Sequence, residues 1–234
     1  MIKIVILSAG PGLPEIVEKY GHSSDWIPEI LSNHNIEFIV RNTYDEDFGD
    51  INEADGWIIT GSKYSVYDKI AWISKLKRFV KLLIDDNKPI LGICFGHQLL
   101  ASCLGAEIKK NPKGWELGSY KISLYDEGKK HLLLKNIFDK EIVYESHQDL
   151  VCNMPSKLIP LAFTDKANQS FAYSNNVFGV QFHPEFSMEV TRMLMDLRAN
   201  DGVDIDSDEL FYSNNSYKVL ENYIEIVKKG DKYE

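Results

Sequence analysis

The sequence predicts an α/β fold, with an open, mostly parallel sheet, helices on both faces and an antiparallel β extension. Two observations predict it. Short apolar runs alternate with helical patterns through residues 1–105, the order of the βα units that build a parallel sheet. Between residues 106 and 182, short β-type runs follow one another without helical patterns between them, which favours an antiparallel extension.

The first half of the chain is expected to contain strands that alternate with helices, except that strands 37–41 and 56–60 follow each other directly. Apolar and β-branched runs predict the strands, and apolar residues at helical spacing predict the helices. Ser24 or Asp25 is the expected N-cap of the first helix. The expected strands are 2–7, 37–41, 56–60 and 90–93, and the expected helices are 24–34, 71–85 and 96–104.

The second half is expected to be rich in short strands and to close with two helices. β-branched and aromatic residues predict the strands. The apolar spacing near the end of the chain predicts the helices. The expected strands are 119–124, 142–144, 158–163 and 170–173, a further β-type run starts at Asn176, and the expected helices are 188–198 and 216–228.

The junction between strand 90–93 and the next helix carries the clearest chemical signal. Gly92 and Gly96 lie two residues before and two residues after Cys94. This is the spacing of a nucleophile elbow, a tight strand-to-helix turn that lifts a reactive side chain off the sheet. The turn also directs the first free N–H groups of the helix at the sulfur, which favours a thiolate and supplies oxyanion donors. We therefore predict that Cys94 is a nucleophile.

A second signal lies downstream, where a β-type run ends in His183-Pro184-Glu185. Side chains two residues apart on a strand point to the same side, so Glu185 can orient the His183 ring. The other ring nitrogen then remains for a thiol. Cysteine, histidine and an orienting carboxylate are the parts of a cysteine-nucleophile triad. We predict Cys94, His183 and Glu185 as the catalytic residues.

The loop after the first strand is unusually long and runs from about Ser8 to Ser23. In an open α/β sheet, loops that leave the carboxyl ends of strands form the functional site. We therefore expect this loop to lie near Cys94.

Together these motifs resemble the class I, or triad, glutamine amidotransferases. Gly-Ile-Cys-Phe-Gly-His-Gln at 92–98 and His-Pro-Glu at 183–185 carry the resemblance. Asp55–Ser62, Trp115–Gly118 and Glu145–Asp149 are similar to further family segments in the same order. The resemblance implies a flavodoxin-like sheet and a single domain of this family over residues 1–234. It is strongest to stand-alone GMP-synthase-like members, including plant γ-glutamyl peptidases.

The resemblance also implies roles for other residues. Backbone N–H groups of Gly61 and Phe95 would form the oxyanion hole, although the family loop often reads Gly-Gly-Pro where this chain has Thr60-Gly61-Ser62-Lys63. The amino-acid end of the substrate would be bound by a set of polar residues. No cofactor or metal is implied. The implied substrate-binding residues are Gln98, Glu116, Ser146, His147 and Gln148.

Composition limits the binding partners and the cellular location expected for such an enzyme. A net charge of −9 over 234 residues argues against a general nucleic-acid binder. The apolar run at residues 1–7 is too short to span a membrane and does not resemble a signal peptide. The three cysteines, at 94, 103 and 152, are odd in number and form no Cys-x-x-Cys pair, which favours a reducing, cytoplasmic location.

The expected activity is hydrolysis of the γ-glutamyl amide bond of glutamine or a γ-glutamyl compound through a thioester. Two alternatives stay open. One is a glutaminase subunit that delivers ammonia to a separate synthetase partner in trans. The other is an inactive binding or regulatory homologue. The sequence leaves the leaving group, the oligomeric state and the pathway undetermined.

Overall fold

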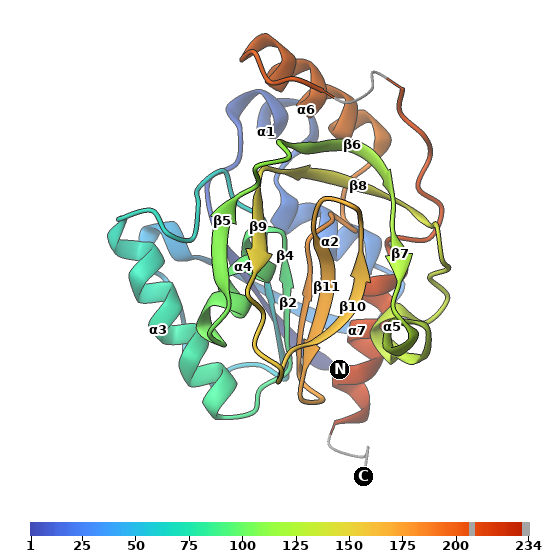
Figure 1. Ribbon diagram of the computed structural model, residues 1–234. Helices are drawn as coiled ribbons and strands as arrows, with labels where there is room; N and C mark the ends of the chain where they lie inside the picture. The colour runs from blue at the N-terminus through green and yellow to red at the C-terminus, as the bar shows by residue number, and fades with distance from the viewer. Residues whose placement is uncertain (206–208, 231–234) are drawn as a thin grey trace.

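The computed structural model describes residues 1–205 and 209–230, and an eight-stranded sheet forms its centre (Figure 1). The strand order is β2-β1-β3-β4-β12-β11-β10-β7. The strands from β2 to β12 in this order run parallel, and β11, β10 and β7 are antiparallel to their neighbours. The bounds are β1 (Ile2–Ser8), β2 (Ile36–Asn42), β3 (Gly56–Ile59), β4 (Ile90–Ile93), β7 (Ser123–Leu124), β10 (Ile159–Phe163), β11 (Asn168–Tyr173) and β12 (Val177–Val180).

Two short antiparallel ribbons complete the β structure. One pairs β5 (Glu107–Lys110) with β9 (Asp149–Cys152), and the other pairs β6 (Glu116–Lys121) with β8 (Ile142–His147). The mostly parallel sheet with an antiparallel extension therefore confirms the predicted fold class.

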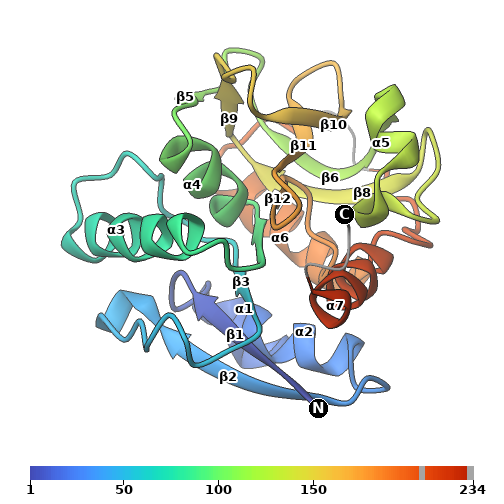
Figure 2. The ribbon, with the colours of Figure 1, turned by 90° about the horizontal axis from the view of Figure 1, so that it is seen from below.

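Helices cover both faces of the sheet (Figure 2). Side chains alternate along β1, so Ile4 and Ile6 pack on one face and Val5 and Leu7 on the other. The first face is covered by α2 (Ser23–Ile30) and α7 (Lys218–Lys229), and the second by α3 (Ala71–Asp85) and α4 (Phe95–Cys103). The remaining helical segments are α1 (Pro14–Tyr20), α5 (Asp126–Lys130), α6 (Met188–Asn200) and the short 3₁₀ turns Thr43–Asp45 and Leu132–Leu134.

The segment predicted as a long loop contains a helix, α1. Pro14 lies in its first turn, where a missing N–H costs no hydrogen bond. Its buried Ile16 joins a small apolar cluster with Leu194 and Met195 of α6. This tertiary contact stabilises a helix too short to be evident from its own sequence.

The predicted cap of the following helix was also wrong. The N-cap of α2 is His22, whose side chain accepts a hydrogen bond from the Ser24 N–H. Asp25 instead accepts a hydrogen bond from the His22 N–H, completing a capping box. The helix also ends at Ile30, four residues before the predicted end.

The predicted strand 119–124 is divided between two sheets. β6 pairs with β8 in a ribbon, whereas β7 joins the main sheet beside β10. Helix α5 and the strands β5 and β9 were not predicted, because each is short and lacks a clear apolar period. By contrast, helix 71–85 has the predicted bounds.

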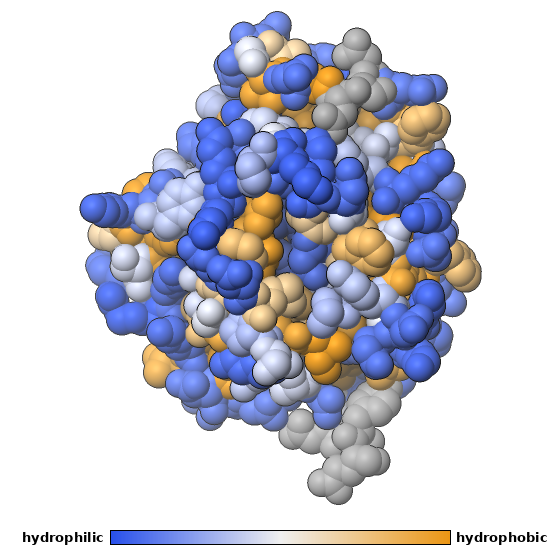
Figure 3. All heavy atoms as spheres, in the orientation of Figure 1, coloured by the Kyte–Doolittle hydropathy of each residue, from blue (hydrophilic) through white to orange (hydrophobic). Residues whose placement is uncertain are grey.

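Polar and charged side chains cover most of the face in Figure 3, and hydrophobic ones show through in small groups. Among the described residues, no helix is both long enough and apolar enough to cross a bilayer.

Candidate active site

Cys94 lies on a strained turn between β4 and α4. Its φ of 51° and ψ of −100° are unusual for a residue with a side chain. Its N–H donates a hydrogen bond to the Val180 carbonyl at 2.9 Å, and its carbonyl accepts one from the Gln98 N–H at 3.1 Å. These bonds hold the turn at its entry and at its exit. The geometry is that of the nucleophile elbow that the glycine spacing predicts.

Both flanking glycines are required by close backbone contacts. A Cβ on Gly92 would lie 2.4 Å from the carbonyl carbon of Gly96. A Cβ on Gly96 would lie 2.4 Å from the carbonyl oxygen of Ile59 in β3. Neither backbone can move away cheaply, because Gly96 lies in the buried first turn of α4 and Ile59 lies in the central strand β3. The glycines allow α4 to start directly against β3 and β4.

His183 and Glu185 form a buried pair beside this elbow. His183 Nδ1 lies 2.8 Å from Glu185 Oε1, and because a carboxylate only accepts, the ring proton is on Nδ1. The two residues lie in a turn after β12, so the turn and not a continuous strand brings them together. Phe186 stacks on the His183 ring at 3.8 Å between centroids, and Trp26 packs edge-on against Phe186. The ring is therefore fixed in position.

Gly61 lies against both the cysteine and the histidine. A Cβ built on Gly61 would lie 2.8 Å from His183 Cε1 and 3.6 Å from the Cβ of Cys94. Within the described ranges, the Gly61 N–H makes no hydrogen bond. This position and the unused donor are what an oxyanion site needs.

The surroundings of Cys94 favour the neutral thiol. Burial raises the pKa of the Cys94 thiol, and the nearby carboxylates of Glu145 and Glu185 raise it further. The Phe95 N–H, at the start of α4, acts in the opposite direction through a hydrogen bond to the sulfur. The prediction that the helix start favours a thiolate gives the right sign for this one contact, but burial outweighs it. For the sulfur to act as a nucleophile, a base would have to remove the thiol proton.

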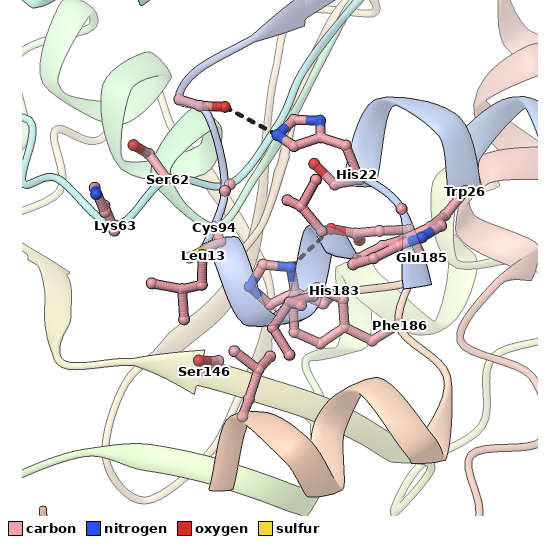
Figure 4. Close-up of a pocket in the computed structure, with 18 of the residues that line it drawn as sticks. Leu13, His22, Trp26, Ser62, Lys63, Cys94, Ser146, His183, Glu185 and Phe186 are labelled. Carbon is pink, nitrogen blue, oxygen red and sulfur yellow. Dashed lines mark hydrogen bonds and ion pairs between the residues drawn. The ribbon is translucent and has the colours of Figure 1, made fainter. Parts of the chain in front are cut away.

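A pocket of about 120 Å³ opens over these residues, and we call it the Cys94 pocket (Figure 4). Cys94, His183, Glu185 and Phe186 line one part of it. The loop after β3, Ser146 of β8 and two residues of α6 line another part. The segment from Gly10 to Trp26 supplies a third wall. The segment after β1 thus lies near Cys94, as expected. Its lining residues are Gly10, Gly12, Leu13, Ile16, Val17, Gly21, His22, Ser23 and Trp26.

Of the five residues expected to bind the substrate's amino-acid end, one lines the Cys94 pocket and four do not. Ser146 lines the Cys94 pocket, whereas Gln98, Glu116, His147 and Gln148 are not among its lining residues. The Gln98 side chain is buried and donates to the Asp149 carbonyl and to Gln181 Oε1, each at 3.1 Å.

Glu116 and His147 instead belong to a buried ionic cluster with Glu145. They lie opposite each other on β6 and β8, and His147 Nε2 is 3.2 Å from one oxygen of each glutamate. Burial lowers the pKa of His147, but the two carboxylates outweigh it and raise the pKa overall. Burial raises the pKa of Glu145. His147 Nε2 thus lies between two carboxylates in this buried cluster.

Asp149 links this cluster to the loop after β3 that contains Gly61, a role that no pattern in the sequence indicates. Its carbonyl accepts hydrogen bonds from Gln98 Nε2 at 3.1 Å and His147 Nδ1 at 3.0 Å. Its carboxylate accepts from Ser65 Oγ at 2.5 Å and Tyr67 OH at 2.9 Å. Ser65 and Tyr67 follow Gly61 in the same loop. Asp149 therefore fixes that loop relative to α4 and β8.

The chain is similar to several known proteins. The profile of the family described as "Glutamine amidotransferase class-I" matches residues 16–197. A glutamine amidotransferase-like protein of Schizosaccharomyces pombe is 33% identical over 82% of each chain. γ-Glutamyl peptidase 5 of Arabidopsis thaliana is 31% identical over 66% of this chain and 62% of its own.

The chain is also similar in sequence to a GMP synthase subunit and in fold to a solved structure. One subunit of the glutamine-hydrolysing GMP synthase of Sulfolobus acidocaldarius is 35% identical over 62% of this chain and 75% of its own. The crystal structure of a glutamine amidotransferase from Thermotoga maritima superposes with a TM-score of 0.74 at 20% identity, covering 97% of this chain and 96% of that one.

Proposed function

Because this chain belongs to the class I glutamine amidotransferase family, we propose that it hydrolyses the γ-glutamyl amide bond of a small molecule through a thioester on Cys94. One observation carries the proposal. Cys94 on a strained elbow, and His183 hydrogen-bonded at 2.8 Å to Glu185, line the same pocket. Nucleophile, base and orienting carboxylate are the complete parts of a cysteine triad.

The acylation step uses each of these groups. His183 Nε2 removes the proton from the Cys94 thiol as the sulfur attacks the γ-carbonyl carbon. Because burial raises the pKa of Cys94, proton removal accompanies the attack instead of preceding it. The carbonyl oxygen becomes an oxyanion, which accepts hydrogen bonds from the backbone N–H groups of Gly61 and Phe95. Oxyanion donors contribute about 2.7–4 kcal/mol each in other enzymes.

Collapse of this intermediate breaks the bond between carbon and nitrogen. The protonated His183 gives its proton to the leaving nitrogen, and a γ-glutamyl thioester remains on Cys94. His183 then takes a proton from water as the water oxygen attacks the thioester carbonyl carbon. The bond between that carbon and the Cys94 sulfur breaks, His183 returns the proton to the sulfur, and glutamate leaves. Glu185 holds the ring tautomer and stabilises the imidazolium in both halves. The thiol chemistry requires reduced cysteine, so we place the enzyme in the cytoplasm.

A glutaminase subunit that passes ammonia to a separate synthetase is the second candidate. The similarity to one subunit of a glutamine-hydrolysing GMP synthase favours it. The wall from Gly10 to Trp26 favours the first candidate, because it adds lining surface to the Cys94 pocket that a leaving group larger than ammonia would contact. The presence of Cys94, His183 and Glu185 argues against an inactive homologue.

The test measures glutamate release by the purified chain from glutamine and from a γ-glutamyl dipeptide. We expect a higher kcat/KM for the dipeptide, because contacts to the additional group are used in the transition state. Preference for glutamine, or activity that needs an added synthetase, would support the glutaminase function. No turnover of either substrate would support an inactive homologue.

A further inference from the structure

The charges that line the Cys94 pocket do not match the charge of the whole protein. The chain carries a net charge of −9, yet two side chains with a full positive charge, Lys63 and Arg198, line this pocket. Among the described lining residues, Glu185 is the one carboxylate, and it is hydrogen-bonded to His183. The pocket therefore favours an anionic ligand.

Arg198 has hydrogen-bonding capacity that the described residues do not use. Its Nε is buried and has no hydrogen-bond partner there. Its Nη1 lies 3.5 Å from a carboxylate oxygen of Asp201, longer than the 2.7–2.9 Å typical of charged pairs, and the Asp201 side chain is 66% exposed. A guanidinium with open donors is suited to binding a planar carboxylate.

A neighbouring aromatic ring also holds this guanidinium in place. Arg198 stacks over the Trp115 ring at 5.2 Å, which limits its motion. It follows Leu194 by one helical turn on α6, so both reach the same pocket from the same face of the helix. An arginine held in this way loses less entropy when it binds a ligand.

Lys63 belongs to a different wall. It follows Ser62 in the loop after β3, and Figure 4 shows both on the far side of Cys94 from Phe186. Its ammonium lies 5.5 Å from the Tyr64 ring, and no ion pair to it is found in the part of the chain that the structure describes. The pocket thus has two cationic groups on separate elements.

We propose that Arg198 binds a carboxylate of the substrate, and that the substrate is a γ-glutamyl amino acid or peptide with two carboxylates. The substrate class rests on the proposed function. Glutamine has one carboxylate, whereas a γ-glutamyl peptide has a second on its leaving group. Arg198 binds either the α-carboxylate of the glutamyl group or the carboxylate of the leaving group, and Lys63 faces the other.

Kinetics of Arg198→Met on two matched substrates identify the carboxylate. γ-Glutamylglycine has a carboxylate on its leaving group, and γ-glutamylglycinamide lacks it. A lost charged hydrogen bond should raise KM about 10- to 100-fold with kcat nearly unchanged. A loss on γ-glutamylglycine alone assigns the leaving-group carboxylate, and equal losses on both assign the α-carboxylate.

Three controls separate binding from folding. Arg198→Lys keeps the charge and should recover part of the affinity. Arg78→Met removes an exposed arginine of α3 and should change neither substrate's KM. Thermal unfolding of each variant reports stability. KM values of Arg198→Met within about twofold of the wild type on both substrates would overturn the proposal.

A binding measurement tests the subsite without turnover. Calorimetry with γ-glutamylglycine is carried out on Cys94→Ala and on Cys94→Ala/Arg198→Met. We expect at least a roughly tenfold weaker affinity for the double variant. If the wild type hydrolyses neither substrate but this difference is seen, the proposed function fails and the carboxylate subsite stands. No binding by Cys94→Ala, or equal affinities of the two proteins, overturns the subsite.

Discussion

A methyl group added at Gly61 should displace the ring of His183, the proposed base, from its position beside Cys94. In Gly61→Ala, the new Cβ would lie 2.8 Å from His183 Cε1, and ordinary contact begins at 3.4 Å, so the ring must retreat by about 0.6 Å. Glu185 holds that ring at 2.8 Å and Phe186 stacks on it, so the retreat distorts both contacts. A misplacement of about 1 Å costs roughly 100-fold in rate. We therefore expect kcat to fall about 10- to 100-fold.

The assay is glutamate release from γ-glutamylglycine, with thermal unfolding measured in parallel. The φ of Gly61 is not in the positive range that disfavours side chains, so the backbone is not strained and the stability loss should stay within the roughly 1–3 kcal/mol of overpacking at the ring. Gly230→Ala is the matched control, since its φ is 57° and no atom of the residues that the structure describes lies within 4 Å of the new Cβ. It should lose about 1–2 kcal/mol of stability and keep its kcat. A Gly61→Ala protein with kcat within about twofold of the wild type would refute the reasoning.

The same geometry leads to three more expectations. Cys94→Ala should lose at least about 10⁴-fold in kcat, and His183→Ala nearly as much. Glu185→Gln should lose less, because Glu185 orients the ring and transfers no proton. A greater loss of kcat for Glu185→Gln than for His183→Ala would contradict these roles. Alkylation of Cys94 by iodoacetamide should keep rising with pH beyond pH 9, because burial raises the thiol pKa above its usual 9.0; a plateau near neutral pH would show a resting thiolate. Asp149→Ala should lower kcat about tenfold, because it releases the loop after β3 that contains Gly61. Asp149→Asn should stay partly active, since its side-chain oxygen still accepts a hydrogen bond from Tyr67. If both variants keep the kcat of the wild type, Asp149 does not have this role.

The elbow and the histidine pair could be predicted because their chemistry is local in sequence. A Cβ on Gly92 or Gly96 would lie 2.4 Å from backbone atoms, which no side chain tolerates, so the turn itself demands the Gly-x-Cys-x-Gly spacing. His183 and Glu185 are two residues apart and meet without help from distant segments. Helix 71–85 was predictable for a similar reason, since its apolar period is sustained along its whole length.

The roles of the remaining site residues depend on contacts that sequence spacing does not encode. Gln98 and His147 lie far apart in the chain, yet both donate to the carbonyl of Asp149, which in turn holds the loop at Ser65. A family pattern can mark such residues as important without revealing which of them reach the pocket. Only the pairing of β6 with β8 shows that His147 faces Glu116 and not the pocket.

The sequence by itself therefore determined the fold class, the elbow at Cys94 and the pairing of His183 with Glu185, because short-range backbone geometry and hydrophobic period decide these features. The tertiary structure decided which groups surround them. Helix α1 forms where Ile16 packs on α6, and Arg198 enters the pocket from a distant part of the chain. Burial, which sets the state of the Cys94 thiol, is a property of the packed molecule and is absent from any single segment.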